Sequence, residues 1–69
     1  MLFSDLSSER IVRALKKAGF RVIHEGKHIG LSDGTRRVTV PRHARVNPFT
    51  LKAVIRDAGL TDREFKELL

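Results

Sequence analysis

His28 is the side chain of this sequence that is best suited to acid–base chemistry. It lies in the segment Gly26-Lys27-His28-Ile29-Gly30, directly after an expected turn. Histidine is the only side chain whose unperturbed pKa allows proton exchange near neutral pH. RNA can be cleaved without a metal when a base takes the proton of its own 2′-hydroxyl group, and such a base contributes about 10² to 10⁴ in rate. Nearby cations such as Lys27 and Arg37 would stabilise the charge that collects on the phosphate.

The other two histidines are weaker candidates, and no residue is identified as the acid that protonates the leaving 5′-oxygen. His24 is expected at the end of the core-facing row of a strand, which favours a structural role at the sheet edge. His43 follows Pro41-Arg42 in a basic loop. Its position is equally consistent with a phosphate contact and with simple solvation.

Positive charge is concentrated in the second half of the chain. Residues 35–56 carry Lys and Arg side chains but no carboxylate, in a chain whose net charge is +6. Such a segment favours contact with a polyanion, although a solvated basic face on a small protein would have the same composition. The residues that we expect to bind RNA phosphates are Lys27, Arg36, Arg37, Arg42, His43 and Lys52.

Length and composition exclude several classes of protein. The 69 residues allow one small domain, and a chain of this size buries only about 60% of the surface of its unfolded form, so no deep pocket is expected. The absence of cysteine excludes disulfides, thiolate nucleophiles and the usual zinc clusters. The histidines are not spaced as metal ligands, and no cofactor is expected. The first residues lack a basic segment followed by an apolar run, so we expect a cytoplasmic protein that does not insert into a membrane.

Three helices are predicted from caps and apolar periodicity. Their N-terminal caps are Ser7, Asn47 and Thr61, and glycines end the first two helices at positions 19 and 59. Apolar residues recur at i, i+3, i+4 and i+7, which predicts core-facing stripes. The stripe of the first helix is Ile11, Val12, Leu15 and Ala18, and that of the second is Leu51, Val54, Ile55 and Ala58. Three phenylalanines are also expected to pack in the core: Phe20, Phe49 and Phe65.

Three antiparallel strands are predicted between the first two helices. Glycines place tight turns at Glu25-Gly26 and Asp33-Gly34. The register that follows pairs Val22 with Ile29 and Ile29 with Val38. Side chains alternate between the two faces of a strand, so one face must pack against the helices. Its apolar row is Phe20, Val22, Ile29, Leu31, Val38 and Val40.

The other face of this predicted sheet carries the candidate site. His28 is expected to be exposed there, opposite Thr39 and one diagonal from Arg37. Gly30 lies next to it on the same strand and leaves room above the sheet. The sequence therefore predicts a histidine beside a cation on an open sheet face.

The order of these motifs resembles the HicA-type (YcfA-like) mRNA interferase toxins. Family members have a Gly-Ser-His-His or Gly-Thr-His turn, then a basic strand ending in Val-Thr-Val-Pro, then a helix ending in Ala-Gly-Leu. The chain departs from them at Lys27, which replaces a small hydroxyl residue and could add a phosphate contact, and at Ile29-Gly30-Leu31, which replaces a second histidine and an aromatic residue. The matching segments are Lys16-Lys17-Ala18-Gly19-Phe20, Gly26-Lys27-His28, residues 33–41, Pro48-Phe49-Thr50-Leu51 and Asp57-Ala58-Gly59-Leu60.

The resemblance implies a complete set of expectations. The fold would be α+β, similar to a double-stranded-RNA-binding domain: a helix, a three-stranded antiparallel sheet, a helix and a short C-terminal helix. Residues 1–69 would form one HicA-like domain. His28 would be the catalytic residue of an endoribonuclease that cleaves mRNA, and the protein partner would be a HicB-type antitoxin.

Two other functional classes stay open on the sequence alone. A non-catalytic module of the same shape could bind duplex RNA through backbone contacts, and a protein-interaction module could present its basic surface to an acidic partner. The ribonuclease and the RNA-binding module share every basic residue. They differ in whether His28 is needed.

Overall fold

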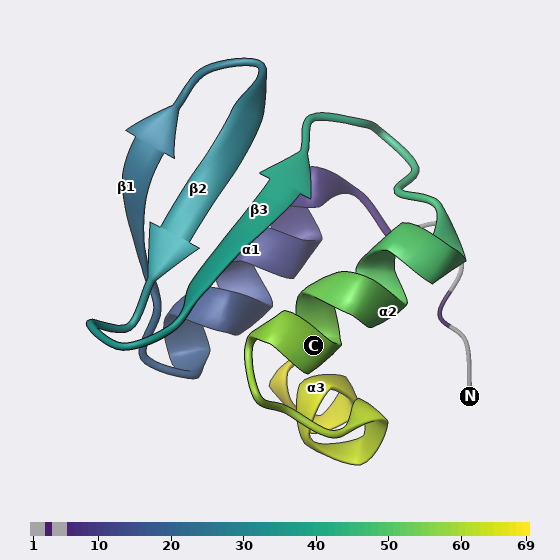
Figure 1. The fold of residues 1–69 in the computed structure, drawn as a ribbon. Helices are drawn as coiled ribbons and strands as arrows, with labels where there is room; N and C mark the ends of the chain where they lie inside the picture. Colours follow the sequence, from purple (N-terminus) through teal and green to yellow (C-terminus); the bar gives the residue numbers. More distant parts are fainter. Residues whose placement is uncertain (1–2, 4–5) are drawn as a thin grey trace.

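The computed structural model of the chain describes residue 3 and residues 6–69. The strands form one antiparallel sheet in the order β1-β2-β3, so the predicted α+β fold of the double-stranded-RNA-binding-domain type is confirmed. None of the helices in these described residues is long and apolar enough to cross a membrane. The elements are α1 (Ser8–Lys17), β1 (Arg21–Glu25), β2 (His28–Ser32), β3 (Arg37–Pro41), α2 (Pro48–Asp57) and α3 (Asp62–Leu68) (Figure 1).

Hydrogen bonds at the helix ends confirm the predicted caps. The side chains of Ser7 and Asn47 each accept a backbone N–H from the first turn of their helix, at 3.2 and 2.8 Å. Thr61 and Glu64 make both bonds of the predicted capping box. The glycines that follow α1 and α2 have φ values of 99° and 75°, which is the left-handed cap that glycine adopts at low cost. These local signals fix where the three helices begin and where α1 and α2 end.

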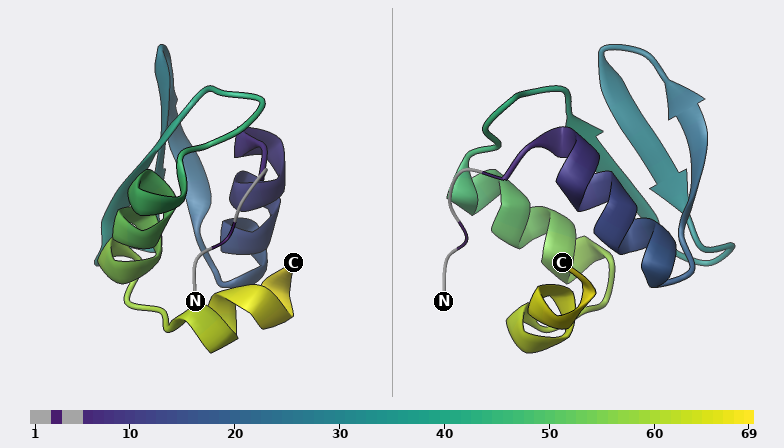
Figure 2. Two further views of the ribbon diagram at one scale, coloured as in Figure 1. Left: turned by 90° about the vertical axis from the view of Figure 1, so that its right-hand side faces the viewer. Right: turned by 180° about the vertical axis from the view of Figure 1, so that it is seen from behind.

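One hydrophobic core joins the helices to a single face of the sheet. α1 lies behind the sheet, α2 lies beside β3, and α3 packs below both helices (Figures 1 and 2). In the described part of the chain, no helix lies in front of the opposite face of the sheet, which is toward the viewer in Figure 1. Val22, which was expected in the core-facing row, is only half-buried. The other members of that row are buried as predicted: Phe20, Ile29, Leu31, Val38 and Val40.

The strand register differs from the prediction by two residues at each pair. Val22 lies opposite Leu31, and Ile29 lies opposite Val40. A shift of two residues leaves every side chain on the same face, so the apolar row alone could not reveal it. The predicted pairs of Val22 with Ile29 and of Ile29 with Val38 are therefore wrong. The cause is the length of the connections: the first turn is centred on Gly26-Lys27, and the second spans residues 33–36.

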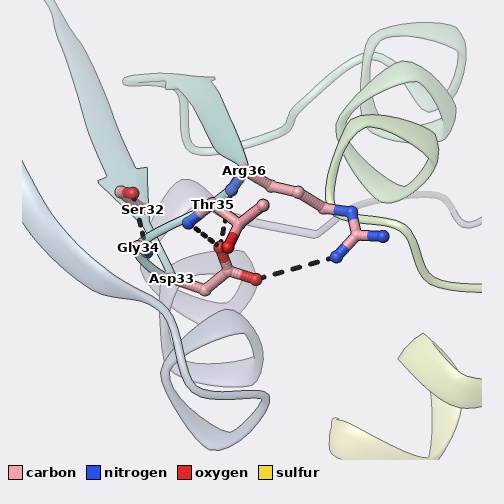
Figure 3. A network of polar contacts seen from close by, with 5 residues as sticks. All are labelled: Ser32, Asp33, Gly34, Thr35 and Arg36. Atoms are coloured by element: carbon pink, nitrogen blue, oxygen red, sulfur yellow. Dashed lines mark hydrogen bonds and ion pairs between the residues drawn. The ribbon is translucent and has the colours of Figure 1, made fainter.

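The second connection is wider than a two-residue turn because side chains hold it. Asp33 Oδ1 accepts the backbone N–H groups of Thr35 (2.9 Å) and Arg36 (2.6 Å), and Ser32 Oγ accepts that of Gly34 (3.0 Å) (Figure 3). The hydrogen bonds from Arg36 and Thr35 lower the pKa of Asp33. Gly34 takes a positive φ of 99°. β3 therefore starts at residue 37, later than a two-residue turn would place it.

Phe49 is the one aromatic side chain that the sequence placed wrongly. Phe65 is completely buried and Phe20 nearly so, and Phe65 meets Phe3 edge to face with ring centroids 5.4 Å apart. Phe49 is 73% exposed. The first residue of the buried stripe on α2 is Leu51, and a residue two positions earlier on a helix points to the opposite side. The prediction that Phe49 packs in the core is therefore wrong.

Candidate functional site

His28 stands at the turn end of the first hairpin. It is the first residue of β2 and is exposed, while the next residue, Ile29, is buried against the helices. Because alternate side chains point to opposite faces, His28 lies on the sheet face that no helix covers in the described part of the chain. The predicted exposure of His28 is confirmed. Its partner on the neighbouring strand β3 is Pro41, and not Thr39 as the predicted register required.

A β-bulge in β1 brings a second histidine to the same face. Val22 pairs with Leu31, but His24 pairs with Gly30, so Ile23 is an extra residue between two ladder positions. Without that residue His24 would follow Val22 to the core side, as the sequence predicted. With it, His24 shares the outer face with Gly30 and His28. The prediction that His24 ends the core-facing row is wrong.

Two glycine positions show where the His24 side chain lies. A Cβ atom added at Gly30 would be 3.4 Å from the Cβ of His24, and one added at Gly26 would be 2.9 Å from its Nε2. The His24 ring therefore reaches from the level of Gly30 toward the turn at Gly26. The Gly26 N–H donates to the carbonyl oxygen of His28 at 3.1 Å. His24 thus approaches the backbone that carries His28.

Arg42 supplies positive charge at this end of the hairpin. Its Nε donates to the carbonyl oxygen of Gly26 at 2.6 Å, and its Nη2 lies 3.7 Å from Glu25 Oε1. Lys27, in the turn itself, is exposed. The loop is tied to α1 by a bond from the Ser8 N–H to the carbonyl oxygen of His43 (3.0 Å). Arg42 lies on the helix side of the hairpin, where it lines a hollow with Glu25 and residues of α1. We call the group formed by His24, Lys27 and His28 on the other side the hairpin-end site.

Three of the predicted phosphate-binding residues lie elsewhere. Arg37 pairs with Ser32 at the far end of the β2-β3 ladder, four residues from the position opposite His28, which is about 13 Å along a strand. Arg36 Nη1 lies 4.0 Å from Asp33 Oδ2, and its guanidinium group lies beside Gly59 at the end of α2. Lys52 Nζ lies 3.5 Å from Asp62 Oδ2. The prediction that Arg37 lies one diagonal from His28 is wrong.

The acid-free segment is therefore not one continuous basic surface. Carboxylates from outside it, Asp33 and Asp62, lie beside Arg36 and Lys52. Of the residues predicted to bind phosphate, Lys27 lies next to His28, and Arg42 reaches the turn from the helix side of the sheet, with His43 next in the chain. His24 was missed because a strict alternation was assumed along β1. The consecutive apolar residues Val22 and Ile23 break that alternation and are the signal that could have indicated the bulge.

Comparison with known proteins concerns the segment from α1 to α2, which includes the sheet. A search of curated proteins finds no match to the chain. Residues 8–60 match the model of a family described as the HicA toxin of bacterial toxin-antitoxin. The match begins at the first residue of α1 and ends just after α2, so it contains the entire sheet and the hairpin-end site. The chain belongs to the HicA family of bacterial toxin–antitoxin systems.

Proposed function

We propose that the protein is an endoribonuclease that cleaves mRNA, with His28 as a catalytic residue. The observation that carries the proposal is the position of His28, which is exposed on the sheet face that no described helix covers and follows the exposed Lys27 in the chain. Membership of a toxin family supports a toxic activity. Expression of the wild type and of His28→Ala in a host cell, with message integrity followed over time, tests the proposal.

The chemistry of the proposed site follows from its residue types. A neutral imidazole of His28 takes the proton of the 2′-hydroxyl group, and the oxygen then attacks the adjacent phosphorus. Lys27 stabilises the negative charge on the phosphate oxygens. Arg42 holds the turn itself through its bond to the Gly26 carbonyl oxygen.

A non-catalytic RNA-binding module is the alternative function. The fold is of a type that binds duplex RNA by shape and backbone contacts, and such binding does not need an imidazole. His28→Ala separates the two functions. It removes cleavage and keeps binding if the protein is a ribonuclease, and it changes little if the protein only binds RNA.

The salt dependence of RNA binding is the first prediction. If the exposed cations hold phosphates, the logarithm of affinity falls linearly with the logarithm of salt concentration, and loss of one contact lowers the slope by about 0.7 to 0.9. We expect this reduction for Lys27→Ala and for Arg37→Ala, measured by fluorescence anisotropy. Arg63→Ala, on α3 at the other end of the molecule from the hairpin turn (Figure 2), is the control and keeps the wild-type slope. A wild-type affinity that is insensitive to salt contradicts phosphate binding.

The second prediction concerns the antitoxin. We propose that the partner is an acidic HicB-like protein that covers His28 and places carboxylates near Lys27, because opposite charges at an interface raise association rates and fix orientation. Co-expression should restore growth. Lys27→Glu should weaken the toxin–antitoxin complex and RNA binding together, whereas Arg63→Glu should affect neither. A complex that leaves His28 accessible and RNA cleavage uninhibited would contradict inhibition by occlusion.

A further inference from the structure

Cleavage of RNA by its own 2′-hydroxyl group requires two proton transfers. One group removes the 2′-hydroxyl proton, and a second gives a proton to the 5′-oxygen when its bond to phosphorus breaks. The proposed function assigns His28 to one transfer and leaves the other without a residue. We infer that His24 is the second acid–base residue and protonates the leaving 5′-oxygen, an inference that rests on the proposed function.

The bulge is the feature that makes His24 available. Val22 and His24 are two residues apart, so a regular strand would turn both toward the helices. The extra residue Ile23 switches the faces toward which the side chains in the second half of β1 point. Glu25 therefore takes the core-side position opposite Ile29. A bulge re-aims a side chain at the cost of one unpaired backbone position. Here the side chain that is re-aimed is an imidazole.

The register sets the separation of the two imidazoles. His24 pairs with Gly30, and His28 lies two residues from Gly30 on the same strand and the same face. The histidines are therefore diagonal neighbours on adjacent strands, with about 7 to 8 Å between such positions, which side chains of this length can span. A phosphate with its attacking and leaving oxygens fits between two groups at this separation. Neither ring needs to contact the other.

Two glycines accommodate the His24 side chain. Gly30 has His24 on one side and Thr39 on the other, and a Cβ atom there would be only 3.4 Å from the Cβ of His24. At Gly26 any Cβ atom would approach His24 Nε2 to 2.9 Å, a distance at which the ring must move. Glycine at both positions lets the His24 ring lie along the end of the hairpin, over Gly26. Its imidazole is thus held at the turn from which β2 and His28 begin.

Charged groups around the pair match the needs of the substrate. Arg21 and Glu25 lie on β1, Lys27 lies in the turn, and Arg42 lies in the loop after β3. The carboxylate of Glu25 lies 3.7 Å from Arg42 Nη2 and belongs to the core-side row, so it does not face the phosphate. Arg42 lies on that same side, so Lys27 is the cation of the turn that remains for the phosphate oxygens.

The complete step balances protons and bonds. The 2′-oxygen gives its proton to neutral His28 and bonds to phosphorus, while the bond from phosphorus to the 5′-oxygen breaks. Protonated His24 gives its proton to that 5′-oxygen. The products are a 2′,3′-cyclic phosphate and a 5′-hydroxyl group, and the two histidines return to their starting protonation states by exchange with water.

A substrate with sulfur in place of the bridging 5′-oxygen tests the role of His24. A thiolate leaves without being protonated, so the sulfur-bridged substrate does not need a general acid. It still needs every other group of the site. We expect His24→Gln to slow cleavage of the ordinary oligonucleotide by about 10² to 10⁴ and to cleave the sulfur-bridged one at nearly the wild-type rate. His28→Gln should be slow on both. His24→Gln should also lose the alkaline fall of the pH–rate profile, since that limb reports the protonated acid.

The controls distinguish failure of the His24 role from failure of the His28 role and of the proposed function. Lys66→Gln on α3 should behave as the wild type on both substrates. Activity of His24→Gln on the sulfur-bridged substrate shows that the variant is folded. Equal slowing of His24→Gln on both substrates, or unchanged cleavage of ordinary RNA, overturns the role of His24 while leaving that of His28 intact. A wild type that cleaves neither substrate overturns the proposed function and this inference with it, and a fully active His28→Gln overturns the role of His28 alone.

Discussion

Replacement of His28 by alanine is expected to abolish growth arrest and to slow RNA cleavage by about 10² to 10⁴. The reason is chemical: the side chain is exposed on the uncovered face of the sheet and contributes no packing to the core, so its removal takes away a proton acceptor and little else. RNA affinity should change by less than the cleavage rate because Lys27 and the other exposed cations are retained. Cleavage of a labelled oligonucleotide and growth after induction measure the two effects.

The folding of His28→Ala can be checked independently. Substitutions of exposed residues away from special features change the free energy of unfolding by about 0.5 kcal/mol or less, so its urea midpoint should equal that of the wild type. A variant that retains cleavage would contradict the catalytic role of His28. A variant that loses cleavage together with its folded structure would show that His28 is needed for the fold, which its exposure does not lead us to expect.

Replacement of Phe65 by alanine is expected to cost about 3 to 5 kcal/mol of unfolding free energy. Phe65 is completely buried, packs edge to face against Phe3, and joins α3 to the rest of the core. A domain of this size has a total stability of roughly 3 to 10 kcal/mol, so the variant should be largely unfolded or near its midpoint. Urea titration followed by circular dichroism measures the change.

Phe49 provides the matched control for this prediction. It is the same residue type on a neighbouring helix but is 73% exposed, so Phe49→Ala should shift the free energy of unfolding by about 0.5 kcal/mol or less. Equal destabilisation by the two substitutions would mean that the structure has assigned one of these aromatic rings to the wrong side of its helix.

The helices and the core face could be predicted because local rules determine them. Ser7, Asn47 and Thr61 are caps whose partners lie within the next three residues, and glycines at positions 19 and 59 end α1 and α2 through their own φ values. The two faces of the sheet follow from alternation, which is insensitive to a shift of two residues. These parts of the fold need no knowledge of distant contacts.

The composition of the site could not be predicted, because it depends on loop length and on one extra residue. The turn held by Asp33 is longer than two residues, and this moves Arg37 to the far end of the sheet from His28. The bulge at Ile23 exchanges the faces of His24 and Glu25. Arg42 reaches Gly26 across 16 positions of sequence, a contact that no local pattern indicates. A catalytic role for His28 could thus be proposed from its motif, while its neighbours required the structure.

The chemical nature of the RNA ends tests the central proposal most directly. Purified wild-type protein and His28→Ala would be incubated with a defined RNA in the presence of a metal chelator, and the products analysed by mass spectrometry. Attack by the 2′-hydroxyl group predicts a 2′,3′-cyclic phosphate on one fragment and a 5′-hydroxyl group on the other, from the wild type only. Intact RNA, cleavage that requires a divalent metal, or fragments with 3′-hydroxyl and 5′-phosphate ends would contradict it.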